Sequence, residues 1–161
     1  MNDQMSHLAI SFVYRDFLDD KRVYILDMYN REIYPRDGPA KKAISRAVEL
    51  RSGTGDQEYL RLLEMNLKAA FSEFEPDLVV YNAGTDVLQG DPLGRLDVTE
   101  EGVVARDEMV FQHARSRSIP IMMVTSGGYQ RSNARVIADS VANLAAKGLI
   151  SLKAGKVAGK L

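Results

Sequence analysis

Three continuous apolar runs divide the chain and predict β-strands at residues 23–28, 78–82 and 119–125. An unbroken apolar run, as opposed to an alternating one, is typical of a strand that is covered on both faces. Pro120 stands at the start of the last run, where a missing N–H group is tolerated. We therefore expect three strands buried between two layers.

Apolar residues at steps of three or four predict three helices between and after these strands. The first begins at Asp56 as N-cap and is closed by Pro76, the second begins at Thr99, and the third opens near Ser132 and stops at Gly148. The stripe of the first helix is Leu60, Leu63, Leu67, Phe71 and Phe74. The buried positions of the third are Val136, Ile137, Val141, Leu144 and Ala145.

The connection between the first strand and the first helix is ambiguous. Residues 40–50 fit either a helix or a strand, and residues 51–55 read as an exposed loop. The alternation of strands and helices elsewhere predicts an α/β fold of three layers, with a largely parallel sheet and helices on both faces. We find no internal repeat and no second domain.

Composition excludes several kinds of site. The 161 residues include no cysteine and only two histidines, His7 and His113, with a net charge of −1. Disulfides, thiolate zinc sites and iron–sulfur clusters are therefore excluded. The balanced charge predicts no direct nucleic-acid binding. No apolar run approaches the ~20 residues of a membrane span, and no signal peptide is recognisable, so we expect an intracellular protein without a membrane span.

The polar loops after the strands hold the candidate chemistry, because ligands of parallel sheets bind beyond the carboxyl ends of the strands. Residues 27–30, 83–86, 90–94 and 126–129 make up these loops. Asp86 could coordinate a metal or cap its own turn, and Tyr129 could donate to an oxyanion or pack at the sheet edge. The glycines of residues 126–128 could also cradle a phosphate. Met122 and Met123 read as core filler.

Two of these segments carry a family resemblance. Residues 79–94 (VVYNAGTDVLQGDPLG) and 121–135 (IMMVTSGGYQRSNAR) resemble the C-terminal half of a zinc-dependent histone deacetylase, most of all the class IV type. Residues 15–34 (RDFLDDKRVYILDMYNREIY) fit the same type. The resemblance implies an arginase/deacetylase-like fold, as a partial and incomplete domain over residues 15–150. An atypical segment, 1–14, precedes it, and a flexible basic tail, 151–161, follows it.

Carried over residue by residue, the resemblance implies a set of roles. Asp86 matches a zinc ligand, and Tyr129 matches the catalytic tyrosine that stabilises the oxyanion. Tyr34 matches an aromatic wall of the substrate tunnel, and Gly127 and Gly128 match the substrate-binding glycine loop. The implied reaction is zinc-dependent hydrolysis of N-acyl-lysine, acetyl or fatty-acyl, in protein substrates that include histones. The implied location is the nucleus, the cytoplasm or both.

The sequence departs from the family in its metal ligands and its base. The family has an Asp-x-His motif and a histidine pair upstream of the matched part, and neither occurs here. A smaller departure is residues 35–38, where the family usually has glycine directly after the proline. Two hypotheses follow: a deacylase at family level, and a truncated, inactive isoform that acts as a binding module. On either hypothesis we expect this chain alone to be inactive, with one edge and one face of its sheet uncovered. An unrelated nucleotide-binding protein is a third hypothesis, which explains neither loop match.

Overall fold

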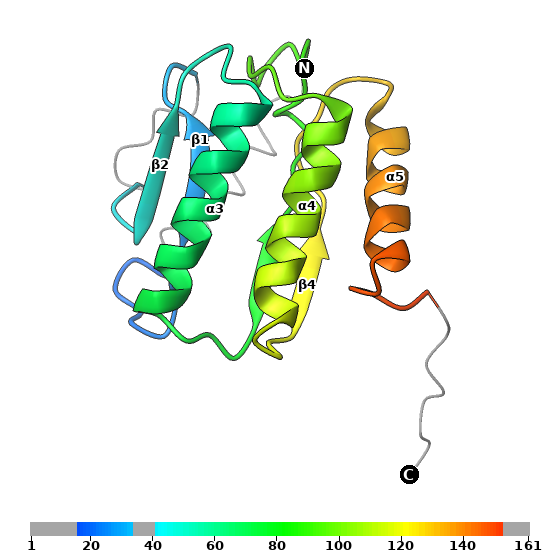
Figure 1. Ribbon diagram of the computed structural model, residues 1–161. Helices are drawn as coiled ribbons and strands as arrows, with labels where there is room; N and C mark the ends of the chain where they lie inside the picture. Colours follow the sequence, from blue (N-terminus) through cyan, green and yellow to red (C-terminus); the bar gives the residue numbers. More distant parts are fainter. Residues whose placement is uncertain (1–15, 34–40, 153–161) are drawn as a thin grey trace.

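The computed structural model describes residues 16–33 and 41–152 (Figure 1). Its strands form two parallel pairs. The strands are β1 (Leu26–Asn30), β2 (Arg46–Leu50), β3 (Val79–Asn82) and β4 (Ile121–Val124), with β1 paired to β2 and β3 to β4. The helices are α3 (Asp56–Glu73), α4 (Glu100–Arg115) and α5 (Asn133–Ala146). The parallel α/β class predicted from the sequence is confirmed.

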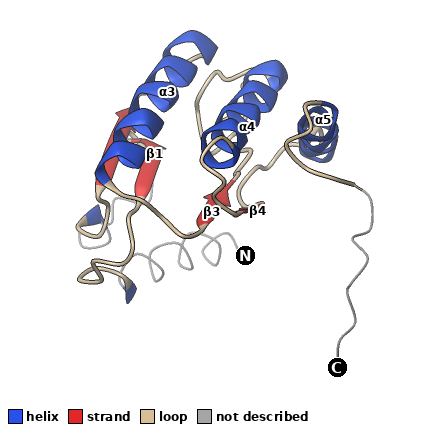
Figure 2. Cartoon of the chain, turned by 60° about the horizontal axis from the view of Figure 1, so that its bottom comes forward, coloured by secondary structure: helices blue, strands red, loops and turns tan. Residues whose placement is uncertain are grey.

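The three helices lie side by side over one face of the strands (Figure 2). Helix α3 packs on β1 and β2, α4 packs on β4 and on both neighbouring helices, and α5 packs against α4. The described residues thus supply two of the three predicted layers, and the predicted sheet consists here of two separate pairs. None of the helices in this part of the chain is long and apolar enough to cross a bilayer.

The ends of the strands depend on which backbone groups find a partner. Strands β3 and β4 fall inside the predicted runs, whereas β1 begins later than predicted and includes residues 27–30, which were expected to form a loop. Val23 instead donates to the carbonyl of Asp20 in a turn at 3.0 Å. The bond from Arg46 N–H to Ile25 carbonyl, 3.0 Å, starts the ladder with β2. The hydrogen-bonded pairing with β2, and not the hydrophobicity of the segment alone, sets the limits of β1.

The ambiguous segment proves to be a strand that is followed by a partly buried loop. Val48 and Leu50 of β2 are 6% and 2% exposed, which is the alternation of a half-buried strand. The next loop was expected to be exposed, but Thr54 in it is only 7% exposed. Gly55 forms a parallel bridge with Asp97, so this loop is covered by the segment that leads into α4.

Helix α3 begins one residue away from its predicted cap. Gly55 is the N-cap, and Asp56 is the first helical residue. The carboxylate of Asp56 accepts from the N–H and the hydroxyl of Thr99, at 2.8 and 2.7 Å. Thr99 is itself the N-cap of α4, as predicted, and accepts from Gly102 N–H at 3.0 Å. Asp56 therefore joins the starts of two helices instead of capping its own.

The outer face of the β3–β4 pair is exposed among the described residues. Val80 and Met122 are register partners and are 58% and 49% exposed, and Val124 is 38% exposed. The expectation from the apolar runs that these strands are buried on both faces is therefore wrong for the described residues, and so is the interpretation of Met122 as core filler. The exposure agrees with the other expectation, that one face of the sheet is uncovered. The physical reason is that no described helix lies on that side (Figure 2).

This apolar outer face is expected to promote self-association of the chain, since contiguous exposed apolar surface marks contact or aggregation sites. Replacing Val80 and Met122 together by threonine should reduce the concentration dependence of the mass measured by light scattering. The free energy of unfolding should change by less than ~0.5 kcal/mol, because both side chains are exposed. Met65→Thr on α3, another exposed methionine, serves as control. Equal scattering for the parent and the double variant would contradict this expectation.

Candidate functional site

The loops after β3 and β4 meet at the carboxyl ends of these strands. The side chain of Asp86, from the first loop, lies against the backbone of Gly127 in the second. A Cβ atom placed on Gly127 would stand 2.7 Å from Oδ2 of Asp86 and 3.2 Å from its Oδ1. The structure thus brings together the aspartate and the glycine loop, which lie about 40 residues apart in sequence, as expected for neighbouring parallel strands.

The glycine loop takes a backbone form that this contact requires. Gly127 and Gly128 have φ values of 60° and 99°, in the left-handed region that side chains disfavour. A Cβ on Gly128 would lie 2.0 Å from the hydroxyl oxygen of Thr85. The carboxylate beside Gly127 also weakens the phosphate-cradle alternative, because a phosphate here would face a like charge.

Asp91 holds the backbone of Tyr129 in place. Its carboxylate is 3% exposed, and its Oδ2 accepts from the Tyr129 N–H at 2.9 Å. Its Oδ1 accepts from the N–H groups of Leu93 and Gly94 at 2.9 and 3.0 Å. The Tyr129 side chain is 36% exposed, so its ring reaches solvent from a fixed backbone. No role for Asp91 was predicted from the sequence, although an aspartate before a proline is a recognisable turn signal.

Gly94 connects this loop to the other strand pair. Asn30, the last residue of β1, is 4% exposed and donates from Nδ2 to the carbonyl of Gly94 at 3.1 Å. The same nitrogen donates to the Ser52 hydroxyl at 3.1 Å. A Cβ on Gly94 would stand 1.6 Å from the carbonyl oxygen of Asp86. The backbone of Asp86 therefore packs directly on Gly94, and Asn30 fixes that contact to β1.

A buried charged pair beneath the Asp86 loop also escaped the sequence analysis. Arg106 and Asp107 of α4 are 4% and 1% exposed, and Arg106 Nε donates to Asp107 Oδ1 at 2.8 Å. A charged pair inside a helix pattern is normally read as part of a solvated face, so no sequence signal identified it.

The remaining residues singled out in the sequence are Tyr34 and the two histidines. Tyr34, and likewise His7, lie outside the described residues. His113 lies in the last turn of α4, and its ring stacks on Phe71 at a centroid distance of 6.0 Å. Burial lowers the pKa of His113, with the charges of Arg117 and Lys68 adding to the effect. These contacts give His113 a packing role at the end of α4.

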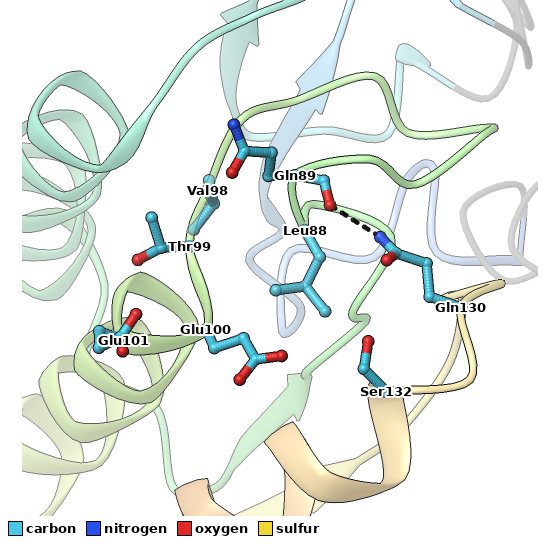
Figure 3. Close-up of a pocket in the computed structure, with 8 residues that line it drawn as sticks. All are labelled: Leu88, Gln89, Val98, Thr99, Glu100, Glu101, Gln130 and Ser132. Carbon is cyan, nitrogen blue, oxygen red and sulfur yellow. Dashed lines mark hydrogen bonds between the residues drawn. The ribbon is translucent and has the colours of Figure 1, made fainter.

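A pocket of about 330 Å³ lies beside the loops, near the first residues of α4 and α5 (Figure 3). Gln130 crosses it and donates to the carbonyl of Gln89 at 2.9 Å. Its lining is Leu88, Gln89, Val98, Thr99, Glu100, Glu101, Gln130 and Ser132. Neither Asp86 nor Tyr129 belongs to this lining, so the pocket is adjacent to the candidate site and distinct from it.

Comparison with known proteins places these loops in one family. A family model described as "Histone deacetylase domain" matches residues 13–145. Histone deacetylase 2 of Arabidopsis thaliana is 56% identical over 138 residues, which are 86% of this chain and 36% of that protein. The chain thus spans little more than a third of the length of this curated relative.

Solved structures share the fold. The HDA15 HD domain aligns with a TM-score of 0.63 at 26% identity, over 84% of this chain and 40% of that one. An acetylpolyamine aminohydrolase from Burkholderia pseudomallei aligns with a TM-score of 0.59 at 20% identity, over 77% of this chain and 38% of that one. The second likeness, at this identity, concerns the fold alone.

Proposed function

The chain belongs to the histone deacetylase domain family, and from this premise we propose that it forms the C-terminal part of the active site of a zinc-dependent lysine deacylase of the class IV type. The reaction is hydrolysis of the amide of an N-acyl-lysine, acetyl or fatty-acyl, in protein substrates. Within it, Asp86 is a metal ligand, and the Tyr129 phenol donates a hydrogen bond to the oxyanion of the tetrahedral intermediate. Gly127 and Gly128, with Tyr34, border the substrate.

One observation above all supports this proposal: the Asp86 carboxylate lies on the backbone of Gly127. Tyr129 follows two residues later, with its N–H held by Asp91. A metal ligand and an oxyanion donor must stand within a few ångströms of the same carbonyl group to act together. The contact between the two loops supports such a pair, because it places the Asp86 carboxylate beside the segment that carries Tyr129.

The described residues do not by themselves fit a complete zinc site. Catalytic zinc takes three protein ligands and leaves a further position open. Residues 16–33 and 41–152 contain no group of three His, Cys, Asp or Glu side chains that could hold a metal. Asp86 can therefore be one ligand, and the others would have to come from outside this part of the chain.

We propose the substrates and the location of this chain by extension from its relatives. The Arabidopsis relative at 56% identity is named a histone deacetylase, and we extend to this chain acyl-lysine proteins, histones among them, as substrates. The corresponding location is the nucleus, the cytoplasm or both.

A second candidate function is a non-catalytic binding module that retains the fold and the substrate loop. The missing three-ligand group among the described residues favours it. So does the position of His113, whose ring stacks on Phe71 at the end of α4 that is remote from the loops.

One experiment tests whether the 161-residue chain is itself a deacylase or only a binding module that keeps the fold. The purified 161-residue chain is incubated with Zn²⁺, analysed for bound zinc, and assayed on acetyl-lysine and myristoyl-lysine peptides. If the chain is a deacylase, one zinc per chain accompanies turnover, and Tyr129→Phe lowers kcat by about 100-fold or more, because it removes the oxyanion donor. Asp86→Asn should remove both zinc and turnover.

Tyr24→Phe is the matched control for the tyrosine variant. Tyr24 bonds to Glu73 and Arg46, away from the loops, and should leave turnover unchanged. A chain that binds peptide with neither zinc nor turnover would favour the binding module. Turnover that survives Tyr129→Phe undiminished would contradict the role assigned to Tyr129.

A further inference from the structure

The Arg106–Asp107 pair lies in the interior directly under the loop that carries Asp86. Both residues belong to α4, which packs over β3 and β4. With 4% and 1% exposure, the pair is almost fully removed from water. Charged side chains are rarely buried to this degree unless their hydrogen bonds serve a specific arrangement.

Asp107 collects donors from three elements. Its Oδ1 accepts from Arg106 and also from the hydroxyl of Tyr81 in β3. Its Oδ2 accepts from the hydroxyl of Ser140 in α5 at 2.5 Å. Burial raises the pKa of Tyr81 well above its usual range, so the phenol stays protonated as a donor. The Asp107 carboxylate thus connects β3, α4 and α5 to the Arg106 guanidinium through hydrogen bonds.

Arg106 in turn reaches the loop after β3. Its Nη1 donates to the carbonyl of Gly84 at 2.6 Å. Gly84 stands two residues before Asp86, and a Cβ on it would lie 2.7 Å from the Ser126 carbonyl and 3.2 Å from Asp86 Oδ1. The orientation of the Gly84 peptide therefore decides both where Asp86 points and how closely the loop after β4 approaches.

A contribution to the free energy of folding does not explain why a buried arginine stands at position 106. The Tyr59 hydroxyl interacts with the guanidinium, but Nη2 is buried without a hydrogen bond of normal geometry among the described residues. A buried donor without a partner costs free energy, and a buried ion pair is commonly no more stabilising than apolar side chains of the same volume. What an apolar residue could not supply is the bond to the Gly84 carbonyl.

We propose that Arg106 is a positioning residue for Asp86: by holding the Gly84 carbonyl, the guanidinium sets the loop that presents the Asp86 carboxylate against Gly127. Asp107, Tyr81 and Ser140 hold the guanidinium in turn. The inference rests on the proposed function in one respect, the role of Asp86 as metal ligand. The geometry that it describes can be measured without metal or substrate.

The test compares local with global protection of backbone amides in the full chain. Leu88 N–H donates to Thr85 carbonyl within the loop, at 3.2 Å, and reports on its local opening. Arg46 N–H donates to the Ile25 carbonyl between β1 and β2, at 3.0 Å, and serves as the remote reference. Amide hydrogen exchange of both is followed by NMR, together with the chemical shift of the Asp86 amide.

Two variants remove the bond to Gly84 in different ways. Arg106→Lys keeps the buried positive charge but not the planar fork that reaches Asp107 and Gly84 together. The double variant Arg106→Met with Asp107→Leu replaces the whole ion pair by apolar side chains. Arg135→Met, which truncates an exposed arginine of α5, is the matched control.

In both variants we expect Leu88 to exchange at least tenfold faster than in the parent chain and the Asp86 amide signal to shift, while Arg46 exchanges at the parent rate. Leu88 rates within twofold of the parent in a folded variant would overturn the proposal. Equal acceleration at Leu88 and Arg46, or loss of protection everywhere, would also overturn it, because Arg106 would then be structural only. If the Asp86→Asn variant keeps the zinc binding and turnover of the parent chain, the proposed function fails, while these exchange rates still decide the role of Arg106.

Discussion

Gly94→Ala is expected to lower the free energy of unfolding by about 3 kcal/mol, near the upper end of the usual cost of overpacking. The added methyl group would stand 1.6 Å from the carbonyl oxygen of Asp86, a backbone atom that no rotamer change can move. Relief by shifting Gly94 is also costly, because its N–H bonds to Asp91 and its carbonyl to Asn30. Urea unfolding followed by circular dichroism measures the change.

Gly55→Ala is the matched control for this substitution. Gly55 is also a loop glycine, but a Cβ on it would have an ordinary contact of 3.5 Å with the Asp97 carbonyl. Its φ of −98° is open to any residue, so the expected loss is ~1 kcal/mol or less, the usual cost of alanine at an N-cap. If the two variants unfold at the same urea concentration, the close packing of Gly94 on Asp86 is refuted.

Asp91→Ala is expected to lower the free energy of unfolding by a similar amount, ~3 kcal/mol, because one buried and two partly buried backbone N–H groups lose their charged acceptor at once. These groups belong to Leu93, Gly94 and Tyr129. The loss should be visible twice, as a lower urea midpoint and as faster amide exchange at Tyr129.

Asp91→Asn separates the contacts that Asp91 makes within residues 90–94 from its contact with the Tyr129 loop. The asparagine oxygen can still accept from Leu93 and Gly94, while its amide group would face the Tyr129 N–H as a second donor. We therefore expect a smaller loss of stability, with the acceleration of exchange confined to Tyr129. Asp77→Ala, at an exposed aspartate, should change neither quantity. Equal exchange at Tyr129 in the parent and in Asp91→Asn would show that Asp91 does not hold this loop.

The sequence predicted those parts of the fold that follow from a local pattern. The apolar runs at β3 and β4 and the threonine cap of α4 are such patterns, and the structure confirms them. The start of β1 was misplaced, because its limits depend on the ladder with β2 and not on its own hydrophobicity. The cap of α3 was misplaced because Asp56 bonds across to Thr99, a contact between residues 43 positions apart.

The same distinction holds for the candidate site. That Asp86 and the glycines of the second loop should meet could be predicted, since parallel strands end at the same edge of a sheet. The roles of Asp91 and Arg106 could not be predicted. Each acts on a backbone group that only the tertiary fold brings within reach, the Tyr129 N–H and the Gly84 carbonyl. The assignment of Tyr34 to the substrate tunnel stays a prediction.

The bond between Ser140 and Asp107 has a consequence for the order of folding. Residues 79–86 lie near the middle of the chain, yet the Asp107 carboxylate that supports them takes one of its donors from α5. Bringing together contacts so distant in sequence costs loop-closure entropy before it yields any stabilisation. The set of bonds beneath Gly84 is complete only once the chain has been synthesised through Ser140 and α5 has docked on α4. The Asp86 loop should therefore gain its full rigidity among the last steps of folding, and lose it among the first when α5 detaches.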